Sequence, residues 1–241
     1  MMPPPPPTVR SPRAREVARR FGIDAHRPAP PRPPFADVRS ILPPPGAITL
    51  VTGASGSGKS SLLRAACCAT DARWIDLDDV KPRDVPLVDC FDERPLDETL
   101  ALLARVGLAE VWTYIRTPSE LSDGQRWRLK LALALNRASS DARLRTILCA
   151  DEFCAVLDRV SAMIVARTLR RAVRAPLSAI VATSHDDLAD ALRPDLIVTC
   201  DFEMGLTLRR GAGSSADDEA CFKRSASTAR TAPGSRTAPP A

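Results

Sequence analysis

The sequence predicts an α/β fold built on a mostly parallel sheet, and three observations support this prediction. Between about residues 47 and 200, short apolar runs alternate with longer helical stretches. A glycine-rich turn joins the first apolar run to the first helix. The two ends of the chain are rich in proline or in small residues and lack the apolar mass of a core. Because strands separated by helices usually pair in parallel, we expect helices to flank the sheet.

The expected folded domain spans residues 35–208, between two tails that the composition predicts to be disordered. Fourteen of the 23 prolines lie within the first 45 residues, and one helical patch, Glu16–Phe21, interrupts the tail over residues 1–34. Residues 209–241 are mostly small, with scattered charge. Without both tails the net charge falls from +5 to −3. Basic tails are typical of solvated arms or of segments that contact nucleic acid, and both interpretations stay open.

Composition also limits the class of protein. No apolar run reaches the roughly 18 residues that span a bilayer, and no signal-peptide pattern opens the chain. If the protein serves a membrane, we expect another chain to carry the membrane part. Seven cysteines without CxxC spacing and two distant histidines argue against a metal site or a disulfide framework, and they favour the cytoplasm.

The elements follow in order from their local patterns. A β-branched run after Pro-Gly predicts the first strand, and the glycine-rich turn precedes the first helix. Two short strand candidates and a largely helical stretch come next, and this stretch would form a small inserted subdomain over about residues 92–138. The expected ranges are Ala47–Thr52, Lys59–Ala69, Arg73–Leu77, Val85–Asp89 and Leu96–Ala138.

The second half repeats the alternation. An apolar strand, an amphipathic helix, a strand, a short helix from Asp186 and a last strand are expected. The strands are Thr146–Ala150, Ala179–Thr183 and Asp195–Cys200, and the long helix covers about Asp158–Arg174. This helix carries five arginines. They predict either a solvated face or a surface that binds a polyanion.

Residues 53–60, GASGSGKS, fit the P-loop pattern GxxxxGK[ST] at every fixed position, with a strand before them and a helix after them. Glycines let successive N–H groups point at phosphates, and the helix dipole adds a positive end. Lys59 is expected to contact the β- and γ-phosphates, and the Ser60 hydroxyl to coordinate Mg²⁺. The expected nucleotide-binding residues here are Gly53, Ala54, Ser55, Gly56, Ser57, Gly58, Lys59, Ser60 and Ser61.

The strand Thr146–Ala150 ends in two carboxylates, Asp151 and Glu152. A buried parallel strand delivers its carboxyl end to the ligand crevice of an open α/β sheet. Asp151 is therefore a candidate for the Mg²⁺ shell. Glu152 is the candidate base that polarises the attacking water.

Leu121-Ser122-Asp123-Gly124-Gln125 precedes a helix. These residues resemble the LSGGQ signature of the ABC ATPase family, which in that family binds the γ-phosphate held by the opposite subunit. The physical reason agrees, since a hydroxyl, a glycine and a helix N-terminus form an anion site. The alternative is a simple helix cap at Ser122 or Asp123.

Two further segments fall in the order of the same family. Ala155-Val156-Leu157-Asp158 resembles its D-loop, which crosses the dimer interface, and Asp158 joins the expected nucleotide-binding residues. His185, at the end of a strand, resembles its switch histidine and would contact the γ-phosphate. The resemblance covers roughly residues 35–208.

Three departures from the family pattern matter. Asp123 replaces a glycine close to the expected phosphate, and Ala155 replaces the usual D-loop serine. No glutamine lies between the P-loop and the signature, so the Q-loop residue is missing, and Asp89 is the expected substitute as a metal or water ligand. Either Phe35 or Phe21 is the candidate for stacking on adenine.

The resemblance implies an ATPase that binds ATP and Mg²⁺ between two copies arranged head to tail, with Lys59, Glu152 and His185 as catalytic residues. Turnover would then drive a conformational change in an unknown partner protein. One alternative is the ATP-binding subunit of a transporter. Two others are a P-loop kinase acting on a small molecule and a nucleotide-sensing scaffold.

Overall fold

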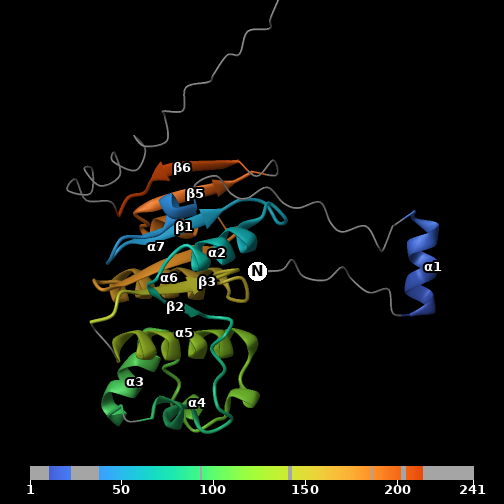
Figure 1. Cartoon of the computed structure of the whole chain (residues 1–241). Coiled ribbons are helices and arrows are strands. Elements are labelled where there is room, and N and C mark those ends of the chain that lie inside the picture. Colours follow the sequence, from blue (N-terminus) through green and yellow to red (C-terminus); the bar gives the residue numbers. More distant parts are fainter. Residues whose placement is uncertain are drawn as a thin grey trace, which may run out of the picture. The chain divides into compact units, whose positions relative to one another are not determined.

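The computed structural model describes residues 11–22, 38–92, 94–140, 143–185, 187–201 and 205–213 (Figure 1). The chain divides into two compact units, Met1–Pro34 and Phe35–Ala241. In the first unit, α1 (Pro12–Arg20) begins after Ser11, whose hydroxyl accepts a hydrogen bond from the N–H of Ala14 at 3.1 Å. The helix is longer at its start than the predicted helical patch.

The second unit is built on a six-stranded sheet in the order β2-β3-β4-β1-β5-β6. The strands are β1 (Ile48–Thr52), β2 (Arg73–Asp76), β3 (Thr146–Ala150), β4 (Leu177–Ala182), β5 (Leu196–Cys200) and β6 (Leu206–Arg210). The first five strands are parallel, and β6 pairs antiparallel with β5. The prediction of a mostly parallel α/β sheet is confirmed.

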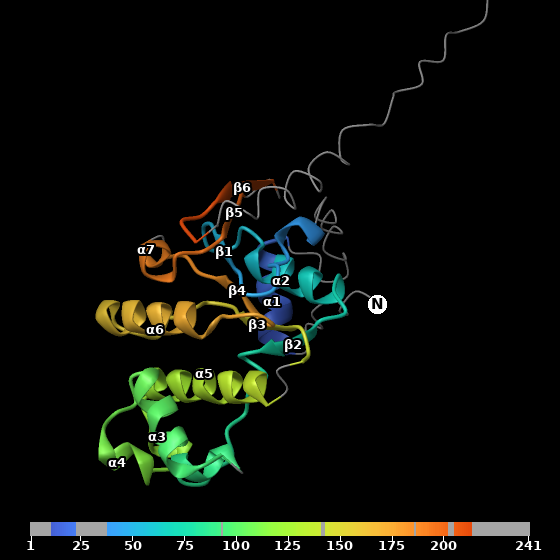
Figure 2. The same cartoon turned by 90° about the vertical axis from the view of Figure 1, so that its left-hand side faces the viewer.

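Helices cover both faces of this sheet (Figure 2). The helix α2 (Lys59–Cys68) and the 3₁₀ turn η1 (Val38–Ile41) lie on one face, and α6 (Arg159–Ala172) and α7 (Leu188–Leu192) lie on the other. Successive strand residues therefore enter two separate hydrophobic clusters. Cys149 packs in the cluster with α2, whereas Leu148 packs in the cluster with α6.

A helical subdomain lies beyond the β2 end of the sheet in both views (Figures 1 and 2). It contains α3 (Leu96–Arg105), α4 (Val111–Tyr114), the 3₁₀ turn η3 (Pro118–Glu120) and α5 (Asp123–Ser139). Its long helix α5 contacts β2 and β3. None of the helices in the described residues is long and apolar enough to cross a membrane.

Two segments differ from expectation. The strand predicted over Val85–Asp89 is wrong, because the chain forms the 3₁₀ turn η2 (Leu87–Phe91) there. Pro86 has no N–H for a strand ladder, and the buried residues Leu87, Cys90 and Phe91 follow helical spacing. The strand β6 has no counterpart among the predicted strands, and it extends the sheet to Arg210.

Candidate nucleotide-binding site

The glycine-rich loop, Gly53–Ser60, connects the carboxyl end of β1 to the amino end of α2. At Gly53, φ is 138° and a Cβ atom would lie 2.5 Å from the carbonyl oxygen of Cys200. Only glycine lets the backbone pass this close in this conformation. The loop leads directly into the first turn of α2, where unpaired N–H groups and the helix dipole attract anions.

Two side chains of the loop fit an anionic ligand. The Lys59 ammonium donates to the carbonyl oxygens of Gly53 at 2.7 Å and of Ala54 at 2.8 Å, so its charge lies over the loop. The hydroxyl of Ser57, a residue only 2% exposed, has no hydrogen-bond partner among the described residues. A buried hydroxyl without a partner costs free energy. A ligand that brings oxygen acceptors to this loop would satisfy it, so these residues fit a phosphate chain.

The carboxylates after β3 lie at the same edge of the sheet. The strand β4 separates β3 from β1, and the register pairs Ala150 with Val181 and Val51 with Ala182. Asp151 is half-buried and Glu152 is exposed. The N–H of Glu152 donates to Oδ1 of Asp151 at 3.0 Å, and Glu152 has φ of 47° in the turn. The fold thus brings both carboxylates and the P-loop to the same end of the parallel strands.

Sequence reasoning missed a third carboxylate, Asp76. It ends β2, where it pairs with Cys149, and by strand alternation it faces the same side of the sheet as Asp151. Burial and the neighbouring carboxylates Asp78, Asp79 and Asp151 raise the pKa of Asp76 above its ordinary value. The signal was present in the sequence, since Ile75-Asp76-Leu77-Asp78-Asp79 also ends an apolar strand in carboxylates.

The loop after β4 and the start of α6 are joined by an ion pair. His185 is exposed, and its N–H donates to Oγ1 of Thr183 at 3.1 Å. Asp158 caps α6, and its hydrogen bonds with Ser161 and Val160 hold the pKa of Asp158 below its ordinary value. The adjacent Arg159 pairs with Asp187, two residues after His185. This ion pair therefore joins the residue after the predicted D-loop to the loop that carries the predicted switch histidine.

The LSDGQ segment forms a capping box at the start of α5. The Ser122 hydroxyl accepts from the N–H of Gln125 at 3.2 Å, and the Gln125 side chain accepts from the N–H of Ser122 at 3.1 Å. The Asp123 carboxylate turns to Arg126, 3.2 Å away, so its charge is partly compensated. The cap alternative is thus correct as local structure. A cap leaves the other N–H groups of the first turn unpaired, so it does not exclude an anion site.

The signature also packs on the D-loop of the same chain. A Cβ atom on Gly124 would lie 3.1 Å from Cδ2 of Leu157 and 3.4 Å from the carbonyl oxygen of Val156. Next to these loops, the rings of Trp127 and Phe153 meet edge to face, with centroids 5.6 Å apart. Phe153 is fully buried and directly follows Glu152. One aromatic contact therefore joins the residue that follows the base candidate to the signature helix.

The similarity of this chain to known proteins supports the nucleotide-binding site described above. Over 194 aligned residues the chain is 34% identical to the lipoprotein-releasing system ATP-binding protein LolD of Maricaulis maris (strain MCS10), and the match covers 64% of this chain and 80% of that protein. The chain belongs to the ABC ATPase family. Residues 36–209 of this ABC ATPase also match the family model described as Novel STAND NTPase 1, and both memberships agree on a nucleoside triphosphatase.

Solved structures share the fold of this ABC ATPase. A dimeric structure of the ATP-binding cassette MJ0796 in a post-hydrolysis state, bound to ADP and Pi, has a TM-score of 0.55 at 18% identity, covering 70% of this chain and 87% of that chain. A bacterial Atm1-family ABC exporter with ATP bound has a TM-score of 0.52 at 16% identity, covering 78% of this chain and 38% of that chain. The predicted fold class is confirmed by this likeness.

Some predicted residues of the ABC ATPase lie elsewhere or outside the described part. Asp89 is exposed in η2 and not at a strand end, and its carbonyl oxygen accepts from Arg83 at 2.5 Å. Asp76, at the carboxyl end of β2, has the position that was expected of Asp89. Phe35 and Asp186 lie outside the described residues. Phe21 belongs to the first unit, and its side chain is exposed.

Proposed function

We propose that this ABC ATPase binds and hydrolyses ATP at sites shared by two copies arranged head to tail. The observation that carries the proposal is the separation of two preformed half-sites. The P-loop, with its unsatisfied Ser57 hydroxyl, joins β1 to α2, whereas Ser122 and Gly124 lie at the start of α5, where Gly124 packs on the D-loop. No hydrogen bond or ion pair between described residues joins Ser122–Gln125 to Gly53–Ser60. A second copy would bring the missing half.

The residues divide the chemistry between them. Lys59 and the N–H groups of the P-loop hold the β- and γ-phosphates and oppose the negative charge that grows during transfer. Glu152, exposed at the end of β3, accepts a proton from the attacking water, and His185 orients that water. The signature residues Ser122, Gly124 and Gln125 of the opposite copy cap the same phosphate.

The donor set also fits a divalent cation. Ser60 and Asp151 offer hydroxyl and carboxylate oxygens, and Asp76 adds a half-buried carboxylate on the same side of the sheet. When bound, Mg²⁺ would supply neutralisation of phosphate charge. We therefore assign Asp76, rather than Asp89, to the position of the missing Q-loop residue. We include a cytoplasmic location in this proposal, because the free cysteines among the described residues are consistent with a reducing compartment.

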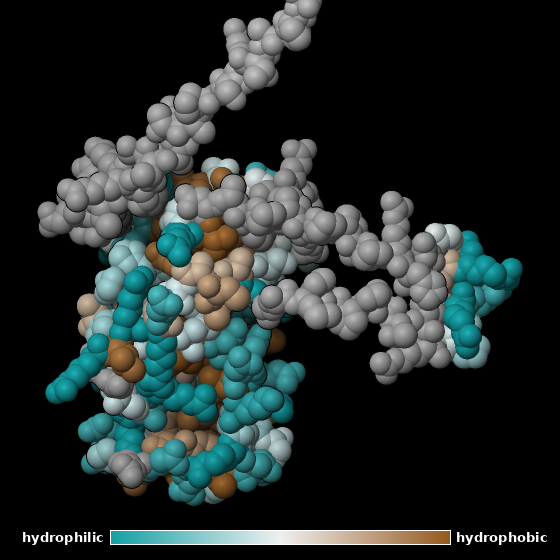
Figure 3. Space-filling view, viewed as in Figure 1, coloured by the Kyte–Doolittle hydropathy of each residue, from teal (hydrophilic) through white to brown (hydrophobic). Residues whose placement is uncertain are grey.

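A second candidate is the ATP-binding subunit of a transporter, and one observation favours it. Val111, Trp112 and Ile115 of the α4 region are 72%, 73% and 65% exposed. Figure 3 shows hydrophobic side chains reaching the surface at this lower end of the molecule. Adjacent exposed apolar side chains are typical of a protein-binding surface. The relative LolD is by name part of a lipoprotein-releasing system, so a membrane partner chain is one occupant of this surface.

The deciding experiment is the oligomeric state of Glu152→Gln, by light scattering after size exclusion, with and without ATP and Mg²⁺. Loss of the base should trap the closed state, so we expect a monomer alone and a dimer only with nucleotide. Glu110→Gln, an exposed glutamate in the helical subdomain, is the matched control and should stay monomeric. A Glu152→Gln protein that binds ATP without dimerising would refute the shared site and favour the kinase alternative.

A further inference from the structure

A groove of about 840 Å³ lies at the edge of the sheet opposite the nucleotide site. Its walls come from α3, α5 and α6, near the last turns of these helices, and its floor reaches Leu177 at the start of β4. Five arginines line it: Arg94, Arg105, Arg167, Arg171 and Arg174. They come from three separate parts of the sequence, and only the fold gathers them.

Most of this positive charge is uncompensated. Arg94 pairs with Glu98 at 3.2 Å, but the guanidinium groups of Arg105, Arg167 and Arg171 have no hydrogen bond or ion pair with any described residue. Arg174 donates only to backbone oxygens. A cation in the last turn of a helix interacts favourably with the helix dipole. The helix dipole explains one arginine at each helix end, but it does not explain why several arginines line one groove.

The spacing of the arginines makes a continuous track. Arg167 and Arg171 follow at i and i+4 on α6, so they form one exposed stripe about 6 Å long, and the exposed Arg174 follows two residues after the helix ends. Arg105, the last residue of α3, stands on the facing wall. The hydroxyl of Thr168 donates to the carbonyl oxygen of Arg105 at 2.8 Å. This hydrogen bond joins α6 to the end of α3 and so holds the two walls side by side. A ligand lying in the groove would meet guanidinium groups on both sides.

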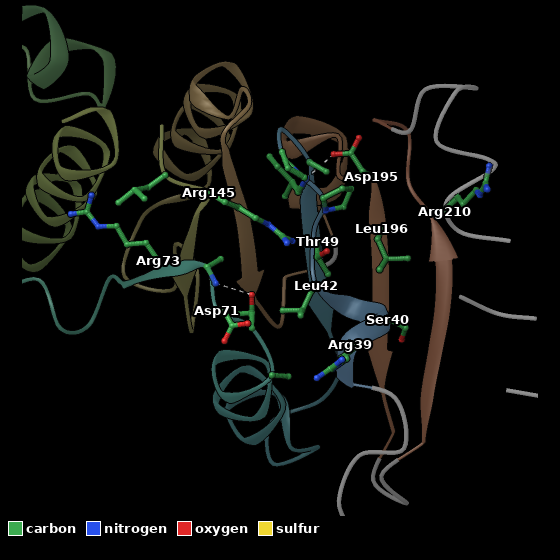
Figure 4. A pocket seen from close by; sticks show the side chains of 18 residues that line it. Arg39, Ser40, Leu42, Thr49, Asp71, Arg73, Arg145, Asp195, Leu196 and Arg210 are labelled. Atoms are coloured by element: carbon green, nitrogen blue, oxygen red, sulfur yellow. Dashed lines mark hydrogen bonds between the residues drawn. The ribbon is translucent and has the colours of Figure 1, made fainter. Parts of the chain in front are cut away.

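The basic surface continues around the same edge of the sheet. A second hollow of about 810 Å³ lies on the α2 side, near the amino ends of β1 and β2 (Figure 4). In Figure 4, Arg145 points towards Thr49, while Arg73 points away from the hollow towards the helices. Arg39 of η1 also lines it. Between the two hollows, Arg170 is neutralised by Asp195 at 2.8 Å. Cationic groups thus occur in two places along one edge.

We propose that this amino edge of the sheet binds the phosphate backbone of double-stranded nucleic acid. Charges spread over two hollows fit a ligand whose charge repeats along its length, and arginine forks match phosphate oxygens. No aromatic side chain is among the described residues that line either hollow, so these residues offer no ring on which a base could stack. The contacts are with phosphate, and binding is independent of sequence. The proposal does not depend on the ATP-driven dimer.

The test measures binding of the full chain to a fluorescent DNA duplex of about 20 base pairs, by anisotropy between about 50 and 200 mM salt. The variant Arg105→Gln/Arg167→Gln/Arg171→Gln removes three exposed, unpaired charges. We expect at least about tenfold weaker binding and a plot of log K against log salt that is shallower by roughly 2–3. Its melting temperature and its ATP hydrolysis without DNA should match those of the wild type.

The control is Arg13→Gln/Arg15→Gln/Arg20→Gln, which removes the same charge from the first unit. If this control abolishes binding while the groove variant binds normally, the tails hold the DNA and the proposal is wrong. Equal losses in both variants would reduce the effect to net charge and would also refute it. The same holds if the wild-type chain ignores DNA but binds poly-glutamate or anionic phosphatidylserine vesicles through the groove, because the partner would then be a protein or a membrane.

Discussion

The carboxyl ends of the parallel strands form one edge of the sheet and their amino ends form the other. The two edges carry side chains of opposite charge and are encoded in the sequence in different ways. The carboxyl edge combines a glycine loop with Asp76, Asp151 and Glu152, and each of its parts is a continuous piece of sequence after one strand. The amino edge carries arginines from α3, α6, η1 and the residues before β3, scattered along the chain. Contiguous chemistry can be predicted from spacing. Chemistry assembled from distant residues becomes visible only in the fold.

The difference also separates what each edge can do alone. At the carboxyl edge, geometry is strict, because a loop must approach phosphate closely and hold one reacting atom. At the amino edge, exposed arginines act as charges that tolerate small displacements. Substitutions at one edge should therefore leave the other unchanged. The first of the four predictions below tests this independence, and the other three test the nucleotide site itself.

The largest effect is expected for Lys59→Ala. Removing the ammonium group that lies over the loop should lower the rate of ATP hydrolysis by about 10³-fold, measured by phosphate release. Lys81→Ala, an exposed lysine outside Gly53–Ser60, should hydrolyse ATP normally. DNA affinity of Lys59→Ala should equal that of the wild type. A parallel loss of DNA affinity would mean that the two edges are coupled.

The second effect is on stability, at Gly53→Ala. A Cβ atom 2.5 Å from the Cys200 carbonyl oxygen forces a shift between the loop and β5, in a backbone conformation that alanine rarely adopts. We expect a loss of about 2–3 kcal/mol and a melting temperature lower by roughly 5–10 °C.

Gly56→Ala is the matched control for this change. Gly56 also has a positive φ, of 82°, but a Cβ atom there meets nothing within 4 Å. Its cost should be limited to backbone strain, about 1 kcal/mol. Equal melting temperatures of the two variants would refute the close approach to Cys200.

The comparison of edges also explains which parts of the fold the sequence predicts. The strand Thr146–Ala150 is found with the predicted bounds because its five residues are all buried and end at carboxylates. The strand β6 escaped prediction because four of its five residues are exposed and it is defined only by pairing with β5. The turn η2 was mistaken for a strand because one buried helical turn and a short strand have similar apolar content. The strand end at Asp76 is visible in the sequence, but only the fold places it beside Asp151, 75 residues further along the chain.

The third prediction asks whether Ser122 is more than a cap. Ser122→Ala should lower stability by about 1 kcal/mol, because the N–H of Gln125 loses its acceptor. In the Glu152→Gln background it should also abolish the ATP-dependent dimer, measured by light scattering. Thr117→Ala removes another capping box, at η3, and should retain the dimer. If Ser122→Ala retains it as well, the hydroxyl serves only α5.

The smallest effect is expected for Asp76→Asn, and its sign distinguishes a functional carboxylate from a structural one. The pKa of Asp76 is raised above 3.8 by burial and by nearby carboxylates, so the folded protein binds a proton more tightly than the unfolded chain. Stability contributed by this group is present at low pH and is lost as pH rises through the raised pKa. Asparagine cannot ionise, and it keeps the oxygen that accepts from the N–H of Asp78 at 3.0 Å. We therefore expect the variant to melt about 1–2 °C above the wild type at pH 7 and no higher near pH 3.5, measured by calorimetry. Asp71→Asn, an exposed carboxylate at the opposite end of β2, should show no such pH-dependent gain.

The stabilised Asp76→Asn protein should also bind Mn²⁺ more weakly in the presence of ATP, measured by electron paramagnetic resonance. A gain in stability without a loss of Mn²⁺ affinity would remove Asp76 from the metal site and leave Asp151 as the carboxylate at that edge.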